Sequence, residues 1–316
     1  MNLGWLLPRK FEPGWMAIDL QPGEMRVAHG LREPGARPLV SQVASYPIEE
    51  GAEAGVKSLA QRMRLGRFRC ETLMRPGEYQ LLTVEAPAVP PAELKAAVRW
   101  SVQGLIDFHI DDATVDVLDI PADAGGSGAA RAMYAVIARN ELVKQHIDRF
   151  QAAAIPLAVI DIAETAQRNI GVLFETAEEQ AIALLYAGET YCLLTVNFKG
   201  ELYLARRIEL GLEQLLRYEE DAREGILSRI LQEVQRTLDV FERQYHYVPV
   251  GKLLFAPEPK DSGLRSHLAE NLEFPVLPLD LGDVVDFVDG VHVDPAAQWK
   301  HFHLIGAALR QDSKAL

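Results

Sequence analysis

Cysteine is nearly absent from this chain, which has only Cys70 and Cys192 among 316 residues. The two lie far apart in the sequence, and neither has partners at the spacing of metal ligands. A disulfide framework is therefore excluded, and this usage is typical of a reducing compartment such as the cytoplasm. We expect both side chains to pack as small buried hydrophobic groups.

Basic residues are also in short supply. The chain has 32 Lys and Arg against 45 Asp and Glu, which gives a formal net charge of −13, and no long basic run occurs. Attraction to the backbone of duplex nucleic acid or to anionic lipid needs a basic surface. Neither is therefore an expected partner.

Long apolar runs are missing as well. No stretch approaches the ~20 apolar residues that cross a bilayer, so we expect no membrane-spanning segment. The apolar stretch Leu3 to Leu7 is too short for the hydrophobic region of a signal peptide, and it precedes the positive charges. We expect an ordered edge or a weak interfacial contact there.

Motifs of common enzyme and metal sites do not occur either. There is no P-loop pattern, and Gly126-Ser127-Gly128 is predicted to be a linker and not a nucleophile elbow. His301 and His303 alternate in a segment predicted to be helical, with no third metal ligand nearby. Every third residue of one acidic segment is an aspartate, namely Asp280, Asp283, Asp286 and Asp289. Calcium loops use a different spacing, so this segment is predicted to be a solvated acidic rim.

What the sequence does contain is an ordered series of strand and helix patterns. Apolar runs at 15–20, 25–30 and 39–46, with the turn Gln21-Pro22-Gly23 after the first, predict a three-stranded meander. The elements predicted next are a helix at 52–64, strands at 70–74 and 79–85, a helix opened by Pro90-Pro91, strands at 115–120 and 132–138, a helix at 140–153, a strand at 157–160 and a helix at 163–174.

The opening pattern then returns. Runs at 181–186, 191–196 and 202–208 predict a second meander, and Gly188-Glu189 stands in the turn that corresponds to Gly23-Glu24. The elements predicted after it are helices at 212–222 and 226–245, a strand at 252–256, and helices at 264–271 and 297–310. The length and this repetition predict two related α/β halves.

Two meander-led halves, one of them carrying extra α/β elements, resemble the actin-like ATPase architecture. Three stretches resemble the PilM family of type IV pilus assembly proteins: Glu93 to Trp100, Glu233 to Asp239 and Gly306 to Arg310. The resemblance covers residues 15–311 in element order. It implies an α/β, actin-like (ASKHA) fold close to that of FtsA and PilM, with two duplicated lobes and an inserted α/β subdomain.

The resemblance also implies a domain division and a partner. Residues 1–67 would begin the first half, 68–155 would form the inserted subdomain, 156–179 would return to the first half, and 180–316 would form the second half. The implied protein is a cytoplasmic scaffold beneath the inner membrane of an MSHA-type pilus system. It would hold the short cytoplasmic tail of a PilN-like, MshJ-type membrane protein, and self-assembly into a ring or platform is a further expectation.

Members of the actin-like superfamily hold ATP between two hairpins, whose N–H groups bind phosphate and whose two acidic residues organise magnesium. Asp19, Gln21 and Gly23 stand in the first hairpin and Gly188 in the second. Pro22 has no N–H to donate, and Tyr186 stands at the second acidic position.

A third element of the family's site, a Gly-Gly turn, is replaced by Ala256-Pro257-Glu258-Pro259. These residues predict a degenerate nucleotide cleft, with Asp19 capping a turn and Gly23 and Gly188 serving as turn glycines. We expect no resident cofactor, and weak binding of ATP with magnesium is the alternative.

Large apolar residues gather after the helix that starts at Pro91. Trp100, Leu105 and Phe108 are the candidate contacts for a partner's tail, since such a groove needs apolar pockets beside a strand edge. The alternative is that they pack the inserted subdomain.

Two other functions are compatible with the same pattern. One is an active actin-like ATPase or sugar-kinase-like enzyme, which should keep an acidic residue where Tyr186 stands. The other is the cytoplasmic component of a type II secretion assembly platform.

Overall fold

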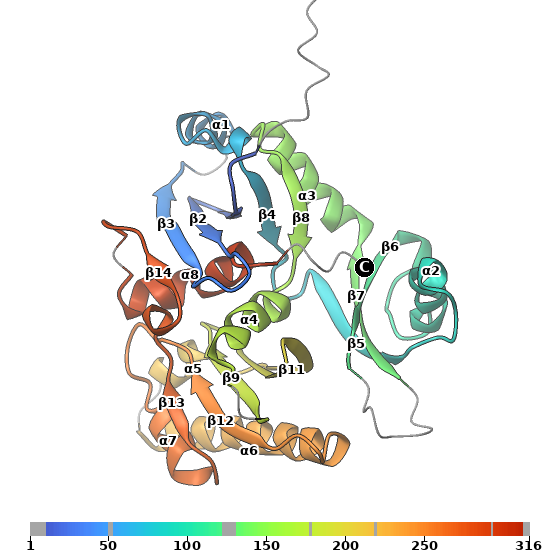
Figure 1. The fold of residues 1–316 in the computed structure, drawn as a ribbon, viewed down its shortest axis with the longest axis vertical. Helices are drawn as coiled ribbons and strands as arrows, with labels where there is room; N and C mark the ends of the chain where they lie inside the picture. Colours follow the sequence, from blue (N-terminus) through green and yellow to red (C-terminus); the bar gives the residue numbers. More distant parts are fainter. Residues whose placement is uncertain are drawn as a thin grey trace, which may run out of the picture.

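The computed structural model describes residues 11–49, 53–121, 131–176, 179–217, 220–291 and 293–311. They form two larger sheets and a smaller third sheet beside them (Figure 1). The predicted linker around Gly126-Ser127-Gly128 and the apolar stretch at 3–7 lie outside these residues. Within them, no helix combines the length and apolar character that a bilayer crossing requires.

The first sheet contains the predicted opening meander. β1 pairs antiparallel with β2, β2 pairs antiparallel with β3, and two later strands continue the sheet in parallel beyond β1. In spatial order its strands are β14 (Asp286–Phe287), β3 (Leu39–Pro47), β2 (Glu24–Leu31), β1 (Trp15–Gln21), β4 (Arg69–Leu73) and β8 (Leu157–Asp161).

The second sheet repeats this plan. It again has an antiparallel meander followed by two parallel strands beyond its first member. Its spatial order is β11 (Glu201–Ile208), β10 (Cys192–Phe198), β9 (Ala181–Ala187), β12 (Val250–Phe255) and β13 (Val276–Pro278). The order third, second, first, fourth, fifth strand is the same in both halves, so the predicted duplication is confirmed.

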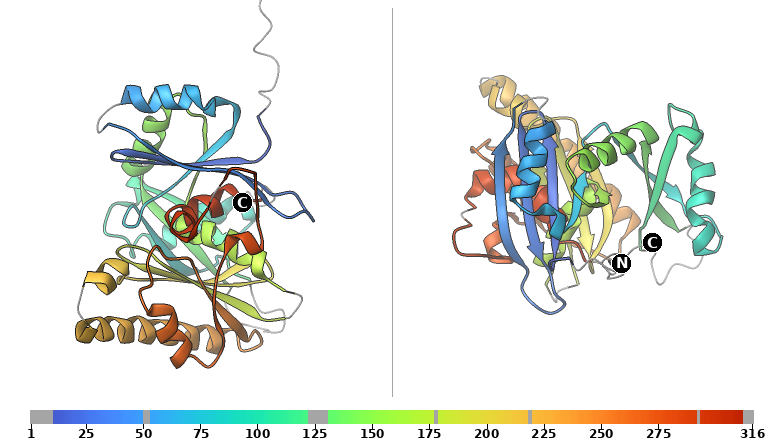
Figure 2. Two further views of the ribbon diagram at one scale, coloured as in Figure 1. Left: turned by 90° about the vertical axis from the view of Figure 1, so that its left-hand side faces the viewer. Right: turned by 90° about the horizontal axis from the view of Figure 1, so that it is seen from above.

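Two helices lie between the sheets and the others cover the outer faces (Figure 2, left). The inner pair is α4 (Ala163–Gly171) and α8 (Pro295–Ala308). The outer helices are α1 (Glu53–Arg62) and α3 (Asn140–Ala152) on the first sheet, and α5 (Leu212–Arg217), α6 (Glu220–Gln244) and α7 (Leu264–Asn271) on the second. Because helices cover both of its faces, the second sheet has fully buried strands β9 and β10.

Gly306 explains how the two inner helices approach so closely. A side chain at this position would collide with the main-chain oxygen of Ala166 on α4. Ala307 and Ala308 follow it and are also buried, and a side chain at Gly30 of β2 would collide with the Ala308 carbonyl oxygen. Gly306 therefore allows the close contact of α8 with α4, while another face of α8 meets the first sheet.

The inserted elements form a separate three-stranded sheet with its own core. Its order is β5 (Tyr79–Glu85), β7 (Ala132–Arg139) and β6 (Ala113–Asp119), and α2 (Pro91–Val102) covers one face. Val98 and Val102 of α2 are buried against these strands. Although the insertion was predicted to begin at residue 68, β4 pairs within the first sheet and the separate sheet starts at Tyr79.

Most element predictions are confirmed with shifts of a few residues at their ends, and both cysteines are buried as expected. The boundary between the helices predicted at 212–222 and 226–245 was placed wrongly, because α5 ends at Arg217 and α6 already begins at Glu220. Two short strands, β13 and β14, were not predicted, because three or two residues leave no alternating pattern to detect. Short 3₁₀ helices connect several elements, at Leu65–Arg67, Ile110–Asp112, Val172–Phe174 and Leu281–Asp283.

Candidate functional site

The first hairpin holds Asp19 and Gln21 against each other. The Asp19 carboxylate accepts a hydrogen bond from Gln21 Nε2 at 2.5 Å, and Asp19 stands opposite Arg26 in the strand pairing. Gly23 has φ of 78°, a left-handed conformation that a turn glycine adopts without strain. Its carbonyl accepts from the N–H of Ile48 at 2.8 Å, so this turn is tied to the end of β3.

A pocket of about 480 Å³ opens beside this turn, and we call it the hairpin pocket. It is lined by the turn residues 20–23, by the start of α1 and by the end of α3. Arg149 of α3 donates to the carbonyl oxygen of Leu20 at 2.7 Å, and Arg75 donates to the same oxygen at 2.7 Å. Gln21 and Gly23 therefore share a pocket within the first half, whereas Gly188 is not part of its lining.

Gly188 lies in the turn of the second hairpin, and both of its main-chain groups are engaged there. Its N–H donates to the Tyr191 carbonyl at 2.9 Å, and its carbonyl accepts from the N–H of Leu212 at 2.8 Å. Those bonds close the turn and fix the start of α5.

Tyr186, at the end of β9, is packed against α8. Its ring stacks on Phe302 at 5.4 Å between centroids and meets the edge of His303 at 4.4 Å. Its hydroxyl donates to the main-chain oxygen of Trp299 at 3.3 Å, and burial raises the pKa of this phenol. Tyr186 is thus a neutral ring in the core.

Neighbouring residues of α8 hold both hairpins. Trp299 donates through Nε1 to the Ala187 carbonyl oxygen at 2.7 Å, and Lys300 Nζ lies 2.6 Å from a carboxylate oxygen of Glu24. Partial burial acts to raise the pKa of Glu24, but hydrogen bonds from Lys300 and Arg26 outweigh it and hold the pKa at about 2. The N-terminal half of α8 therefore links the turns that hold nucleotide in actin-like enzymes.

The segment 256–259, where the sequence predicted a replaced Gly-Gly turn, also has its polar groups engaged. The N–H of Ala256 donates to the Leu185 carbonyl oxygen at 2.9 Å. Half-buried Glu258 accepts from the N–H and the hydroxyl of Ser262, at 3.1 and 2.7 Å, while burial raises its pKa. The hydrogen bonds of Glu258 are therefore made within its own loop, to Ser262.

His303 belongs to a buried polar link between α8, α4 and the second sheet. Gln167 Nε2 donates to the carbonyl oxygens of Leu184 and Leu193, at 2.9 and 3.1 Å, so its Oε1 is left to accept from His303 Nε2 at 3.1 Å. Burial lowers the pKa of His303 to about 3. Among the described residues, no three His, Cys, Asp or Glu side chains are close enough to hold a metal ion.

Because the pKa of His303 is lowered in the folded protein, we expect the fold to lose stability in mild acid. The unfolded chain takes up a proton near pH 6.5, whereas folded His303 takes one up only near pH 3, so stability from this group falls as the pH drops below 6.5. We expect its share of the loss to be about 2 kcal/mol at pH 5. Chemical unfolding of wild type and His303→Asn at pH 7.5 and 5 should show that difference. The control His109→Asn, at an exposed histidine, should follow wild type, and equal acid losses in His303→Asn and wild type would refute the assignment.

Trp100 on α2 and Leu105, just beyond its end, are both exposed apolar side chains of the insert, and we call the two together the α2 patch. The relative exposures of Trp100 and Leu105 are 73% and 59%. For these two, the alternative that they pack the subdomain is wrong. Phe108 differs, because it packs partly against the subdomain core and the Arg139 guanidinium lies over its ring at 4.1 Å.

A buried junction joins the insert to both lobes. The Tyr79 hydroxyl of β5 donates to Glu164 of α4 at 2.5 Å, and Arg207 of β11 lies 3.0 Å from that hydroxyl and 3.5 Å from the other Glu164 oxygen. Burial raises the pKa of Glu164, although Tyr79 and Arg207 act against it. One carboxyl therefore connects three parts of the fold.

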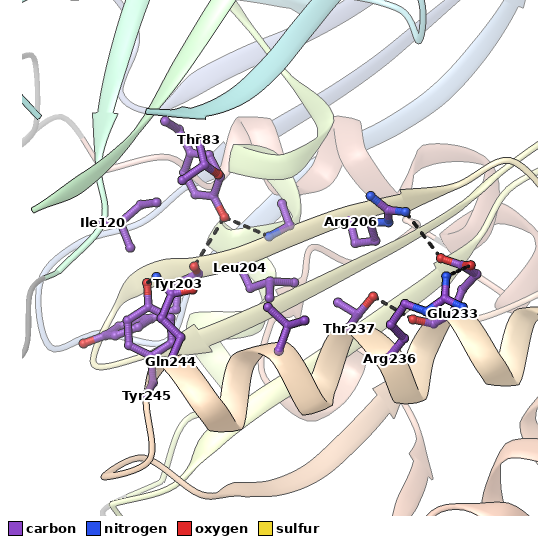
Figure 3. Close-up of a pocket in the computed structure, with 13 residues that line it drawn as sticks. Thr83, Ile120, Tyr203, Leu204, Arg206, Glu233, Arg236, Thr237, Gln244 and Tyr245 are labelled. Carbon is purple, nitrogen blue, oxygen red and sulfur yellow. Dashed lines mark hydrogen bonds and ion pairs between the residues drawn. The ribbon is translucent and has the colours of Figure 1, made fainter. Parts of the chain in front are cut away.

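A second pocket lies between the insert and the second lobe (Figure 3). Its volume is about 290 Å³, and β5, β7, β11 and α6 contribute to its walls. Arg206 and Arg236 meet at Glu233 at one end, and Tyr203 and Tyr245 lie at the other. We call it the β11 groove.

The comparisons with known proteins support the fold. No family model matches the chain, and no curated protein matches it. Among solved structures, it is similar to a chain of a "PilM-PilN type IV pilus biogenesis complex", with a TM-score of 0.69, 19% identity, and coverage of 96% of this chain and 98% of that chain.

The fold is α/β and actin-like, with two duplicated lobes and an inserted subdomain. More distant likenesses are to the cytoplasmic domain of EpsL, an inner membrane component of the type II secretion system of Vibrio cholerae, and to a Bacteroides thetaiotaomicron protein with an actin-like ATPase fold. Their TM-scores are 0.46 and 0.49, at 13% and 9% identity, with coverage of 84% and 88% of this chain and 90% and 93% of theirs.

The sequence did not point to the junction or the β11 groove. Arg206 and Arg207, two charges in a mostly apolar strand, were the available signal, since such residues in a strand need partners on both faces. Their partners lie 27 to 128 positions away in the chain, beyond the reach of local patterns.

Proposed function

We propose that this chain is a non-enzymatic scaffold of type IV pilus biogenesis of the PilM kind, and more narrowly the MshI protein of an MSHA-type pilus. The observation that carries the proposal is the likeness over 96% of the chain to a member of a PilM-PilN complex. In this proposal the chain works in the cytoplasm, beneath the inner membrane, and binds the tail of a PilN-like, MshJ-type protein.

The absence of catalysis is part of the proposal. Tyr186 is buried in an aromatic stack where an enzyme of this fold needs a carboxylate for magnesium, and Trp299 and Lys300 link the two hairpins. A side chain packed in this way supports the contact between lobes instead of a metal ion. The actin-like frame would then serve as a surface for partners.

The α2 patch is the proposed contact for the partner's tail. An exposed tryptophan and an exposed leucine on one small subdomain are typical of an interaction site, because aromatic anchors contribute most of the energy of many interfaces. Phe108, half covered by Arg139, would border the same contact.

The test is a titration with a fluorescent synthetic peptide of the N-terminal tail of the neighbouring PilN-like protein. We expect micromolar binding, and the double variant Trp100→Ala, Leu105→Ala should weaken it at least about tenfold. Leu277→Ala removes another exposed leucine, on the second lobe, and serves as the control; its exposure is 43% against 59% for Leu105. No binding at high micromolar peptide would refute the adaptor, and full binding by the double variant would refute the role of the patch.

A further inference from the structure

The β11 groove follows an unpaired sheet edge. β11 is the last strand of its sheet and pairs only with β10. Its outward main-chain groups are met by one side chain of the insert, since the Tyr134 hydroxyl accepts from the N–H of Ala205 at 3.0 Å and lies 3.3 Å from the Tyr203 carbonyl oxygen. A phenol thus occupies a place that a neighbouring strand fills within a sheet.

The edge continues beyond Tyr134. Residues 205 and 207 point their main-chain groups away from β10, because the N–H of Ala205 faces the insert and orientation alternates along a strand. Apart from the pairing of β11 with β10, from which these groups point away, the described residues give no hydrogen bond to the Ala205 carbonyl or the Arg207 N–H. One acceptor and one donor are therefore available at the spacing an added strand uses.

Positive side chains outnumber negative ones in the ion-pair cluster beside this edge. Arg206 Nη2 lies 3.4 Å and Arg236 Nη1 3.0 Å from oxygens of Glu233, so two guanidinium groups share one carboxylate. Both arginine side chains are largely exposed, at 56% and 70%. On a chain of net charge −13, this is a local positive excess, and a further carboxylate would complete the pairing.

The floor of the groove is apolar. Val240 of α6 is 42% exposed, and Leu204 and Tyr245 lie beside it. An added strand places alternate side chains on the same face, so one could cover Val240 while a near neighbour on that face reaches the arginines. One backbone acceptor and one backbone donor of β11 are thus near an apolar floor and a positive end.

We infer that the β11 groove binds an extended peptide segment of a partner protein, which adds as a strand to β11 and places an acidic side chain between Arg206 and Arg236. The main-chain hydrogen bonds supply sequence-independent affinity, and the carboxylate and its apolar neighbour supply selectivity. This site is separate from the α2 patch, and the inference does not depend on the proposed pilus function.

The probe is a phage-displayed library of random 12-residue peptides, selected on the intact chain. Peptides that carry an acidic residue flanked by apolar residues at alternate positions should be enriched. Synthetic copies should bind Arg236→Glu at least about tenfold more weakly than wild type, because reversal places two carboxylates where one is now shared. Arg265→Glu, at an exposed arginine on α7, makes the same change of charge outside the groove and should leave binding unchanged.

Hydrogen exchange locates the peptide. Bound peptide should slow exchange of the Arg207 amide, whereas a ligand that contacts only the arginine side chains should not. Enriched peptides that bind both charge variants equally, or that leave this amide unprotected, would overturn the inference. So would sedimentation showing that the groove is covered by a second copy of the chain, in a dimer that Arg236→Glu dissociates.

Discussion

Replacing Arg207 with methionine should lower the free energy of unfolding by about 3 kcal/mol at neutral pH. Arg207 is the only cation within salt-bridge distance of Glu164 in the part of the chain that the structure describes, and Glu164 is almost fully buried, at 3% exposure. Without Arg207, the Glu164 carboxyl must either remain charged in an apolar site or take up a proton. Both cost stability at neutral pH.

The pH dependence separates this effect from lost packing. Burial raises the pKa of Glu164 above its value in the unfolded chain, and removal of Arg207 should raise it further. A group with a raised folded pKa binds its proton more readily when folded, so the penalty should shrink as the pH falls toward the unfolded value of 4.5. Urea unfolding at pH 7.5 and 5 measures this change.

Two companion variants complete the test. Glu164→Gln removes the charge that Arg207 balances, so the double variant Glu164→Gln, Arg207→Met should regain much of the loss. Arg206→Met, the exposed neighbour on the same strand, should change stability by less than about 1 kcal/mol. A penalty that is independent of pH and equal in the single and double variants would show that Arg207 contributes by packing alone.

Placing an acidic residue at position 186, with Tyr186→Asp, should destabilise the fold by about 4 kcal/mol. The change removes a buried ring that stacks on Phe302 and places a carboxylate in the same apolar space. Tyr186→Phe keeps the ring and loses only a hydrogen bond of 3.3 Å, so it should cost less than about 1 kcal/mol. Thermal unfolding followed by circular dichroism compares the three proteins.

The same proteins test the absence of nucleotide chemistry. We expect calorimetry to detect no micromolar binding of ATP with magnesium to wild type or to either variant, because Trp299 and Lys300 still link the hairpins. Micromolar affinity in wild type would overturn the non-enzymatic proposal. A stable Tyr186→Asp protein that gains ATP binding would show that Tyr186 alone closed the site.

The sequence by itself determined the elements and their order. Period-two strands, helices with apolar stripes, and turns such as Gln21-Pro22-Gly23 are local patterns, and the return of the meander predicted the duplication that both sheets show. The sequence also supported the prediction of a degenerate nucleotide cleft, because the residue types Pro22 and Tyr186 are known without coordinates. Gly306 stood in the sequence as part of a motif, but its role in bringing α8 against α4 came from the structure.

Only the tertiary structure decided what these residues contact. Tyr186 meets Phe302 and Trp299 more than 100 positions later in the chain, and Glu164 meets both Tyr79 and Arg207. Such contacts depend on how two lobes and an insert pack, which no period or spacing encodes. The exposure of Trp100 could not be predicted from the sequence for the same reason. An apolar residue on a helix is buried or exposed to solvent according to whether another element covers that face of the helix.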